Sequence, residues 1–552
     1  MKIALAQLNY IPGDIAHNSA KIISAINHAK LQKAELAIFS EMAITGYHPL
    51  DLLHREEIIS AAMNAVKEIA VQCQNIAAIV GGPSPNTGVY GKGLHNSAFF
   101  MYEGKVKAVI NKALLPTYDV FDEARYFEPG NVFETISFKD IKIALTICED
   151  IWDEQPCGDK GLCRYYGITP LDELIKEKPN LIVNIAANPF SHNRLKVREE
   201  IFKKNAAEYK LPFISVNQIG GYTELIFDGS SVVIDASGNT VEKLAFCKEE
   251  IRIIEIPFNN PESFRSRTSF SYPEDMMEYV HKALVTGIFD FFSKSGQKRA
   301  VIGLSGGIDS AVVLALAAEA LGAENTLAVL MPSTYSSEHS VADAIDMAGR
   351  LGVPYHIVSI EEARLTMEKA VKPFFGNRES DITEENIQAR LRAVILMAFS
   401  NKLGYMVLNT SNKSEAATGY GTLYGDMIGG LSVIGDVYKT EVYRLARHIN
   451  SAKEIIPENI ISKAPSAELK YGQLDTDSLP PYDLLDAILF RYIDLERSPQ
   501  RIISEGYDKA LVEKVIRLVR TSEFKRRQVA PVLRVSSRAF GFGRRIPVIS
   551  KY

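Results

Sequence analysis

Six consecutive residues, Ser305-Gly306-Gly307-Ile308-Asp309-Ser310, separate an apolar run at 300–304 from an apolar-periodic stretch at 311–321. This pattern predicts a strand, a tight turn and a helix. The two glycines let the backbone turn sharply and approach a ligand, while the start of the helix offers unpaired N–H donors. The turn is therefore suited to an anion, most simply a phosphate. An ordinary strand-to-helix turn with a capping Ser or Asp is the alternative.

Strands and helices alternate steadily around this turn. We expect strands at 300–304, 326–331, 355–358 and 405–408, and helices at 309–321, 337–351 and 384–403. Such alternation predicts an α/β fold with a doubly wound parallel sheet, which binds ligands beyond the carboxyl ends of its strands. The 305–310 turn and the 409–412 turn both occupy such ends.

In the first half of the chain, strands and helices do not alternate so regularly. A strand at 2–8 and a helix at about 20–34 are followed by apolar runs that helices separate only in part, so a mixed sheet layered with helices is expected. The apolar periodicity lapses around 259–266. We therefore predict one domain at 1–262, a linker at 263–275 and a second domain at 276–552.

The composition argues for small-molecule partners. The 552 residues carry a formal net charge of -5, so no basic surface for nucleic acid is indicated. Residues 1–10 alternate between apolar and polar as in a strand, unlike a signal peptide, and no apolar run is long enough for a membrane span. The five cysteines fit free thiols. We therefore expect a cytoplasmic protein. Cys148, Cys157 and Cys163 lack the paired spacing of a structural zinc site.

Three reactive side chains follow apolar runs in the first half: Glu41, Lys112 and Cys148. A thiol attacks a carbonyl carbon only as thiolate, so it needs a base such as Glu41 and a cation such as Lys112. Taken separately, each residue could equally be a surface Glu, a solvated Lys or a buried Cys.

The phrases around these residues, 39–47, 111–116 and 146–152, resemble the nitrilase superfamily of amidases. The resemblance implies an α-β-β-α sandwich in which Glu41 is the base, Lys112 supports the oxyanion and Cys148 is the nucleophile. It also implies a set of contacts near the amide substrate, glutamine: Tyr118, Glu123, Asn188 and Lys196. This chain has Asn188 where the family commonly has Ser, and Ser191 could substitute for it.

The turn at 305–310 lacks the Lys of a Walker loop, G-x-x-x-x-G-K-[ST]. Its pattern, S-G-G-x-D-S, resembles the pyrophosphate loop of the ATP pyrophosphatases. That resemblance implies a Rossmann-like sheet, adenylation of a carboxylate by ATP, release of pyrophosphate and an Asp that helps to hold Mg²⁺.

An amidase followed by an ATP pyrophosphatase resembles the family of glutamine-dependent NAD synthetases, as do the phrases at 409–420, 424–426, 436–440 and 463–469. The resemblance implies that ammonia from a Cys148 thioester amidates adenylated deamido-NAD to NAD, with release of AMP, pyrophosphate and glutamate. It implies ATP contacts from Gly303, Leu304, Ser305, Gly306, Gly307, Ile308, Asp309, Ser310, Thr410, Lys439 and Ser466. It further implies deamido-NAD contacts from Asn386, Glu415, Asp426 and Lys525, and Mg²⁺ ligands from Asp309 and Glu415. Leu423 is a departure, because single-domain relatives that use ammonia tend to carry Lys there.

Three other functions stay open on the sequence. One is an ammonia-dependent synthetase with a vestigial amidase half, and another is a different amidotransferring ATP pyrophosphatase, such as those that make GMP or asparagine. The third is a binding protein with an inactive amidase half, which would have lost the reactive residues. The family resemblance also implies a homo-oligomer.

Overall fold

The structure is a computed structural model that describes residues 1–152, 154–156, 162–259, 264 and 272–550. The chain forms two compact units: Met1–Tyr222 with Ile226–Glu274, and Thr223–Leu225 with Asp275–Tyr552. Of the predicted linker 263–275, residues 263 and 265–271 lie outside the description. In the described part of the chain, no helix combines the length and the apolar character needed to cross a membrane.

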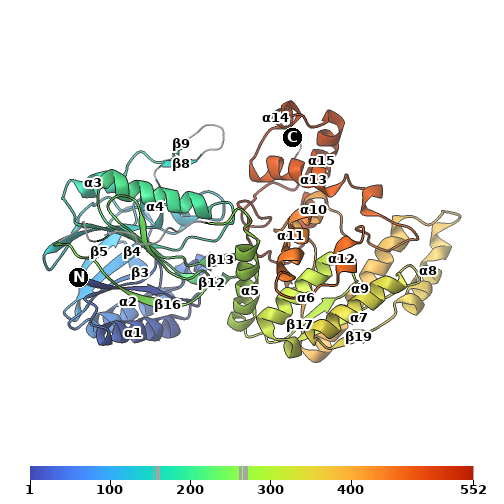
Figure 1. Cartoon of the computed structure of the whole chain (residues 1–552), viewed down its shortest axis with the longest axis horizontal. Helices are drawn as coiled ribbons and strands as arrows, with labels where there is room; N and C mark the ends of the chain where they lie inside the picture. Colours follow the sequence, from blue (N-terminus) through green and yellow to red (C-terminus); the bar gives the residue numbers. More distant parts are fainter. Residues whose placement is uncertain (153, 157–161, 260–263, 265–271, 551–552) are drawn as a thin grey trace. The chain divides into compact units, whose positions relative to one another are not determined.

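Two six-stranded mixed sheets form the centre of the first unit (Figure 1). The first sheet has the order β16-β1-β2-β3-β4-β5, and the second has the order β15-β14-β11-β10-β7-β6. The strands of the first sheet are β1 (Lys2–Gln7), β2 (Leu36–Ile38), β3 (Ala77–Pro85), β4 (Leu94–Tyr102), β5 (Lys105–Asn111) and β16 (Glu250–Glu255). Those of the second are β6 (Ile136–Phe138), β7 (Ile141–Ile147), β10 (Leu181–Ala186), β11 (Phe213–Asn217), β14 (Val232–Ile234) and β15 (Thr240–Lys243). Two short hairpins add β8 (Glu154–Pro156) with β9 (Leu162–Arg164), and β12 (Ile219–Tyr222) with β13 (Leu225–Asp228).

Helices cover the outer faces of these two sheets. An apolar cluster joins α1 (Ile15–Leu31) and α2 (Glu56–Gln72) to the first sheet, and another joins α3 (Pro170–Ile175) and α4 (Leu195–Tyr209) to the second. A third cluster, with Leu5, Ile38 and Leu145, fills the space between the sheets. The layers confirm the α-β-β-α sandwich. The helix predicted at 20–34 begins earlier, because the Asp14 carboxylate caps it by accepting the His17 N–H at 3.0 Å.

The second unit contains a five-stranded sheet in which every pairing is parallel, with the order β19-β18-β17-β20-β21. Its strands are β17 (Ala300–Gly303), β18 (Thr326–Leu330), β19 (Tyr355–Ile357), β20 (Met406–Asn409) and β21 (Leu431–Ser432). Its helices are α5 (Met277–Lys294), α6 (Ile308–Leu321), α7 (Glu338–Leu351), α8 (Glu361–Phe375), α9 (Ile382–Leu403), α10 (Lys413–Thr418), α11 (Lys439–Ile449), α12 (Glu458–Ser462), α13 (Tyr482–Leu489), α14 (Pro499–Ser504), α15 (Lys509–Thr521) and α16 (Glu523–Arg526). This sheet confirms the predicted doubly wound architecture. The strand order reverses between β17 and β20, which is where ligands of such sheets bind.

The predicted turn at 305–310 joins β17 to α6 and needs its first glycine. Gly306 has a φ of +79°, and a Cβ there would lie 2.2 Å from the Ser340 carbonyl oxygen. Any other residue would have to displace the start of α7. The turn therefore packs against its neighbours and still leaves its N–H groups near the edge of the sheet.

A buried lysine connects distant parts of the second unit. Lys413 Nζ lies 3.0 Å from Asp436 Oδ1 and 3.2 Å from Asp494 Oδ2, and it donates to Ser536 Oγ at 2.8 Å. Burial acts to lower the pKa of Lys413, but the charges of Asp436 and Asp494 outweigh it and the pKa is raised. The ammonium group therefore stays charged and holds α10 against two later segments.

We expect Lys413→Met to destabilise the second unit by about 3–5 kcal/mol, because the variant leaves two buried carboxylates without their cation. Chemical denaturation followed by circular dichroism measures the loss. Lys453→Met, at an exposed position, is the matched control and should change stability by less than about 0.5 kcal/mol. A similar effect of both substitutions would contradict the structural role of Lys413.

Candidate active sites

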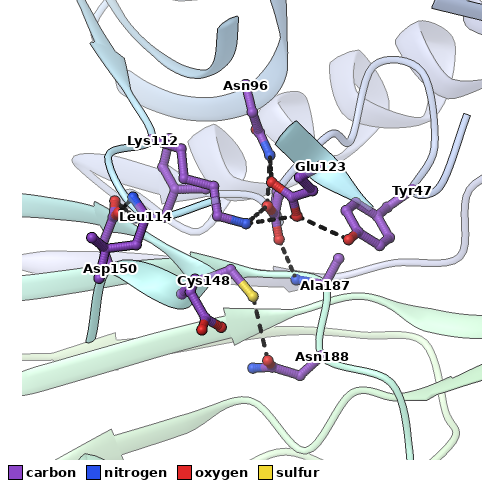
Figure 2. A network of polar contacts seen from close by, with 12 residues as sticks. Tyr47, Asn96, Lys112, Leu114, Glu123, Cys148, Asp150, Ala187 and Asn188 are labelled. Atoms are coloured by element: carbon purple, nitrogen blue, oxygen red, sulfur yellow. Dashed lines mark hydrogen bonds and ion pairs between the residues drawn. The ribbon is translucent and has the colours of Figure 1, made fainter. Parts of the chain in front are cut away.

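The structure brings Glu41, Lys112 and Cys148 together in the first unit. Figure 2 labels Lys112 and Cys148 in this group. Each follows the carboxyl end of a different strand: Glu41 follows β2, Lys112 follows β5 and Cys148 follows β7. Glu41 and Lys112 are fully buried, and Cys148 is 3% exposed. These side chains would be costly to bury separately, so their common location indicates a functional group of residues.

Hydrogen bonds fix the position of the two charged groups. Lys112 Nζ donates to Glu41 Oε1 and to Glu123 Oε1, both at 2.8 Å. Glu41 also accepts from Asn96 Nδ2 at 2.7 Å and from the Ala187 N–H at 3.0 Å. The two ion pairs use two of the three donors of the ammonium group, which leaves the third for a substrate oxygen.

The resting thiol is protonated. Burial raises the pKa of Cys148 well above its ordinary value, the Glu41 charge raises it further, and Lys112 opposes both effects. Burial also raises the pKa of Glu41, again against the charge of Lys112. A neutral thiol needs a base close by before it can attack, and Glu41 is the carboxylate that Lys112 holds near it.

An amide side chain lies directly beside the nucleophile. Cys148 Sγ donates to Asn188 Oδ1 at 3.4 Å, whereas the buried Asn188 Nδ2 has no hydrogen-bond partner among the described residues. A buried donor without a partner is unfavourable, and an acceptor atom of a bound substrate would satisfy it.

Asp150 connects the segment that carries Lys112 to the one that carries Cys148. Its Oδ1 accepts the N–H groups of Ala113 and Leu114, both at 2.9 Å, and its Oδ2 accepts the Ile147 N–H at 3.0 Å. The sequence analysis did not identify Asp150, Asn96 or Tyr47 as parts of the site. Tyr47 lies in the Glu41 phrase, and its hydroxyl donates to Glu123 at 2.9 Å.

The other predicted glutamine contacts occupy different positions. The Tyr118 hydroxyl donates to Glu149 Oε1 at 2.9 Å, and Tyr166 donates to the same oxygen at 2.9 Å. Glu149 is buried next to Cys148, and burial raises its pKa to about 7. Lys196 is exposed in the first turn of α4, where no contact among the described residues joins it to this group.

The second unit has a cavity of about 290 Å³ at the carboxyl ends of β17, β18 and β20. Most of the predicted ATP residues line it, and so do two residues predicted for deamido-NAD, as follows: Gly303, Leu304, Ser305, Gly307, Ile308, Asp309, Ser310, Thr410, Lys439, Ser466, Glu415 and Asp426. Gly306, Asn386 and Lys525 are not part of the lining.

Two carboxylates in the cavity share one ammonium group. Lys439 Nζ forms an ion pair with Asp309 Oδ2 and lies 3.9 Å from Glu415 Oε1, while Asn412 Nδ2 donates to Asp309 Oδ1 at 3.0 Å. Burial, together with the Asp309 charge, raises the pKa of Glu415 to about 8. Burial acts to lower the pKa of Lys439, but the charge of Asp309 raises it.

The donor set of this cavity fits Mg²⁺, which takes one or two protein carboxylates and completes its coordination with phosphates and waters. Asp309 and Glu415 supply two such carboxylates. Within the described residues no cluster of three or more His, Cys, Asp or Glu side chains could hold a metal ion by itself. Cys157 and the Cys163 side chain lie outside those residues.

Further buried groups hold Lys439 at the start of α11. The Lys439 N–H donates to Ser414 Oγ at 2.9 Å, and Ser414 Oγ in turn donates to Asp486. Asp486 also accepts the Thr440 N–H and the Thr440 hydroxyl, both at 2.9 Å. The sequence analysis did not identify Asp486, which lies 46 residues after Thr440 in the chain.

The remaining residues predicted for deamido-NAD converge on the loop 419–426. Thr422 donates through its N–H to Asp426 Oδ1 at 2.6 Å and through its hydroxyl to Asn386 Oδ1 at 2.7 Å. Lys525 Nζ donates to the carbonyl oxygens of Gly419 and Gly421 at 2.8 and 2.7 Å. In this structure Asn386 and Lys525 therefore shape the loop, and only Asp426 also lines the cavity.

Comparison with known proteins gives matches along the chain. The carbon-nitrogen hydrolase family model matches residues 2–156, and the NAD synthase model matches residues 280–529. The glutamine-dependent NAD(+) synthetase of a Synechocystis species is 43% identical over 100% of this chain and 99% of its own length, and that of Thermotoga maritima is 38% identical over 100% and 99%. A solved structure of the glutamine-dependent NAD+ synthetase from Acinetobacter baumannii, in complex with ADP, has a TM-score of 0.78 at 38% identity and covers 99% of this chain and 98% of that one.

The site in the first unit predicts how amide hydrolysis at Cys148 depends on pH. Because burial raises the pKa of Glu41 above 4.5, this base is protonated, and activity is lost, at a higher pH than for a free glutamate side chain. The acid limb of the pH profile of glutamate release from glutamine should therefore have a midpoint above 4.5, the ordinary pKa of a glutamate side chain.

Glu149→Gln is the control for this assignment, because the pKa of Glu149 is also raised, to about 7. The acid limb should persist in that variant. Its disappearance would assign the limb to Glu149 and contradict the role of Glu41.

Proposed function

This chain belongs to the family of glutamine-dependent NAD(+) synthetases, and from that premise we propose how its residues divide the reaction. The protein makes NAD from deamido-NAD with a glutaminase unit and a synthetase unit. We assign the glutaminase to residues 1–262 and the synthetase to residues 276–552, with a linker at 263–275. The observation that supports the glutamine-dependent reaction most strongly is the buried group of Glu41, Lys112 and Cys148. A vestigial amidase half would have no reason to keep these charges buried together.

In the glutaminase, Glu41 takes the Sγ proton of Cys148 as the sulfur attacks the amide carbon of glutamine. The free donor of Lys112 stabilises the oxyanion of the tetrahedral intermediate. Collapse of this intermediate breaks the C–N bond, and the proton held by Glu41 passes to the leaving nitrogen, which departs as ammonia. Water, deprotonated by Glu41, then hydrolyses the Cys148 thioester to glutamate.

The neighbouring residues bind and orient the amide. Glu123 is the second carboxylate paired with Lys112, and the two ion pairs together hold the ammonium group in place for the substrate oxygen. Asn188 Nδ2 donates to glutamine, as its missing partner suggests. We assign Tyr118 and Lys196 to glutamine as well, and for Lys196 the assignment depends on the family resemblance alone.

In the synthetase, ATP binds in the cavity with its phosphates on the 305–310 turn. The ADP complex of the Acinetobacter baumannii relative supports the use of an adenine nucleotide. Thr410, Lys439 and Ser466 contact ATP in the same cavity. Asp309 and Glu415 would hold Mg²⁺, which when bound neutralises phosphate charge. Lys439, now paired with Asp309, then serves as a point charge for a phosphate oxygen.

The deamido-NAD carboxylate attacks the α-phosphorus of ATP, and the bond to pyrophosphate breaks. Ammonia then attacks the carbonyl carbon of the adenylate, which expels AMP and leaves the amide of NAD. Asn386, Glu415, Asp426 and Lys525 form the deamido-NAD side, where the loop 419–426 would lie against the dinucleotide.

We further propose a homo-oligomer. Apolar side chains on α8 and α9 are exposed in the single chain, and a second copy could cover them: Leu365, Met367, Phe374, Ile382, Val394 and Met397. Sedimentation velocity measures this directly, and a monomer at micromolar concentration would contradict it.

The division of labour predicts that Cys148→Ala abolishes NAD synthesis with glutamine and retains synthesis with ammonium salts, because only the first requires the thioester. NAD formation from deamido-NAD and ATP with each nitrogen donor measures both rates. Equal losses with the two donors would contradict the assignment of Cys148.

The reciprocal variant is Asp309→Ala. It should lower NAD synthesis with both donors by at least about a hundredfold, because a proposed Mg²⁺ ligand is lost, while glutamate release from glutamine persists. Unchanged synthesis would contradict the assignment of Asp309 to Mg²⁺.

A further inference from the structure

Arg392, on α9, lies in the wall of the synthetase cavity. Its Nε donates to the Met331 carbonyl oxygen at 3.0 Å, just after the end of β18. This is the one hydrogen bond that the described residues give it, so its two terminal Nη groups make none there. The family resemblance assigned no role to this residue.

Arg392 is half-buried. Two buried lysines of this unit have carboxylate partners within ion-pairing distance, Lys413 with Asp436 and Lys439 with Asp309. Burial lowers the pKa of Arg392 to about 10, so the guanidinium is still charged at neutral pH. A charge withdrawn from water without a partner is unfavourable, and a bound anion would relieve that cost.

Two acidic groups, Asp426 and Glu468, act on Arg392 through their charge, and both form their hydrogen bonds with other residues. Asp426 Oδ1 accepts the Thr422 N–H at 2.6 Å. Glu468 Oε1 accepts from Lys463 Nζ at 2.5 Å and from Ser340 Oγ at 2.7 Å. The Nη donors of Arg392 are therefore available to a ligand that enters the cavity.

The position of Arg392 relative to the sheet suggests which ligand this is. α9 packs against β17 and β20, the strands between which the order reverses, whereas Lys439 begins α11, which packs against α6. The cavity thus receives a cation from each of these two separate helices, and a further lining cation, Lys463, is paired with Glu468. A guanidinium presents a planar fork of donors that matches two oxygens of a phosphate group, which a single ammonium cannot do.

We propose that Arg392 is a second anion-binding residue of the synthetase cavity and takes a phosphate group of a bound nucleotide through its two Nη donors. The phosphate belongs either to ATP or to the pyrophosphate bridge of deamido-NAD. The proposal rests on the proposed position of ATP in this cavity.

The test compares Arg392→Met and Arg392→Lys with the parent in the full-length protein. NAD synthesis with ammonium salts is measured while ATP or deamido-NAD is varied, so that kcat and both KM values are obtained. Arg392→Met should raise one KM by about 10- to 100-fold, the effect of losing a charge-assisted bidentate contact, and Arg392→Lys should recover only part of it. A rise for ATP identifies ATP as the source of the phosphate, and a rise for deamido-NAD identifies the dinucleotide.

Both KM values within twofold of the parent in Arg392→Met would overturn the proposal, and so would a fall in kcat alone, which is what a merely structural contact with Met331 would give. Undiminished glutamate release and an unchanged circular dichroism spectrum show that the variant is folded. If Arg392→Met does not fold, the KM values of Arg392→Lys test the proposal, because lysine keeps the positive charge but lacks the two Nη donors.

Two further variants separate this proposal from the one it rests on. Lys402→Met removes a charge from the exposed end of α9 and should leave both KM values unchanged. Lys439→Met should raise the KM for ATP. If Lys439→Met does so and Arg392→Met does not, only the role of Arg392 is wrong. If neither does, the position of ATP is wrong as well.

Discussion

The pairing of a buried lysine with two carboxylates is the interaction on which both units depend. Lys112 lies between Glu41 and Glu123 in the first unit, and Lys413 lies between Asp436 and Asp494 in the second. A charge can be removed from water only where such partners surround it, so each lysine imposes a specific arrangement on segments that are distant in the chain. In the first unit that arrangement is the active site that we propose. In the second it secures α10, which carries Glu415 of the cavity wall and begins after Asn412, a donor to Asp309.

Both sites use the ends of strands for the same reason. A strand buried on both faces has room for functional side chains only where it leaves the sheet, and several strands deliver their ends to one edge. In the first unit β2, β5 and β7 each contribute one reactive residue. In the second, β17, β18 and β20 surround a cavity that receives Lys439 from α11 and Arg392 from α9. The rigid sheet fixes the positions, and the short segments after the strands supply the chemistry.

Short sequence patterns predicted those strands and helices whose limits depend on neighbouring residues in the chain. The strands and helices that were predicted between 300 and 409 appear within about two residues of their expected limits, because apolar runs mark the strands and Gly322, Gly352 and Gly404 end the helices. α8 was not predicted, since its apolar residues, including Leu365 and Phe374, are exposed and Pro373 lies within it. Asn96, Asp150 and Asp486 were missed for a different reason. Each acts on a partner tens of residues away, and nothing in the adjacent sequence marks such a contact.

The sequence by itself determined the two α/β architectures, because these depend on short-range periodicity. It predicted the trio of Glu41, Lys112 and Cys148 and the phosphate turn, because short motifs around them resemble known families. Only the tertiary structure decided how the charges are partnered. It showed that Lys439 bonds to Asp309, that Asn386 and Lys525 shape a loop instead of lining the cavity, and that Arg392 lacks a carboxylate partner among the described residues. The energy of a buried charge depends on everything within a few ångströms of it, and the chain brings those neighbours together only by folding.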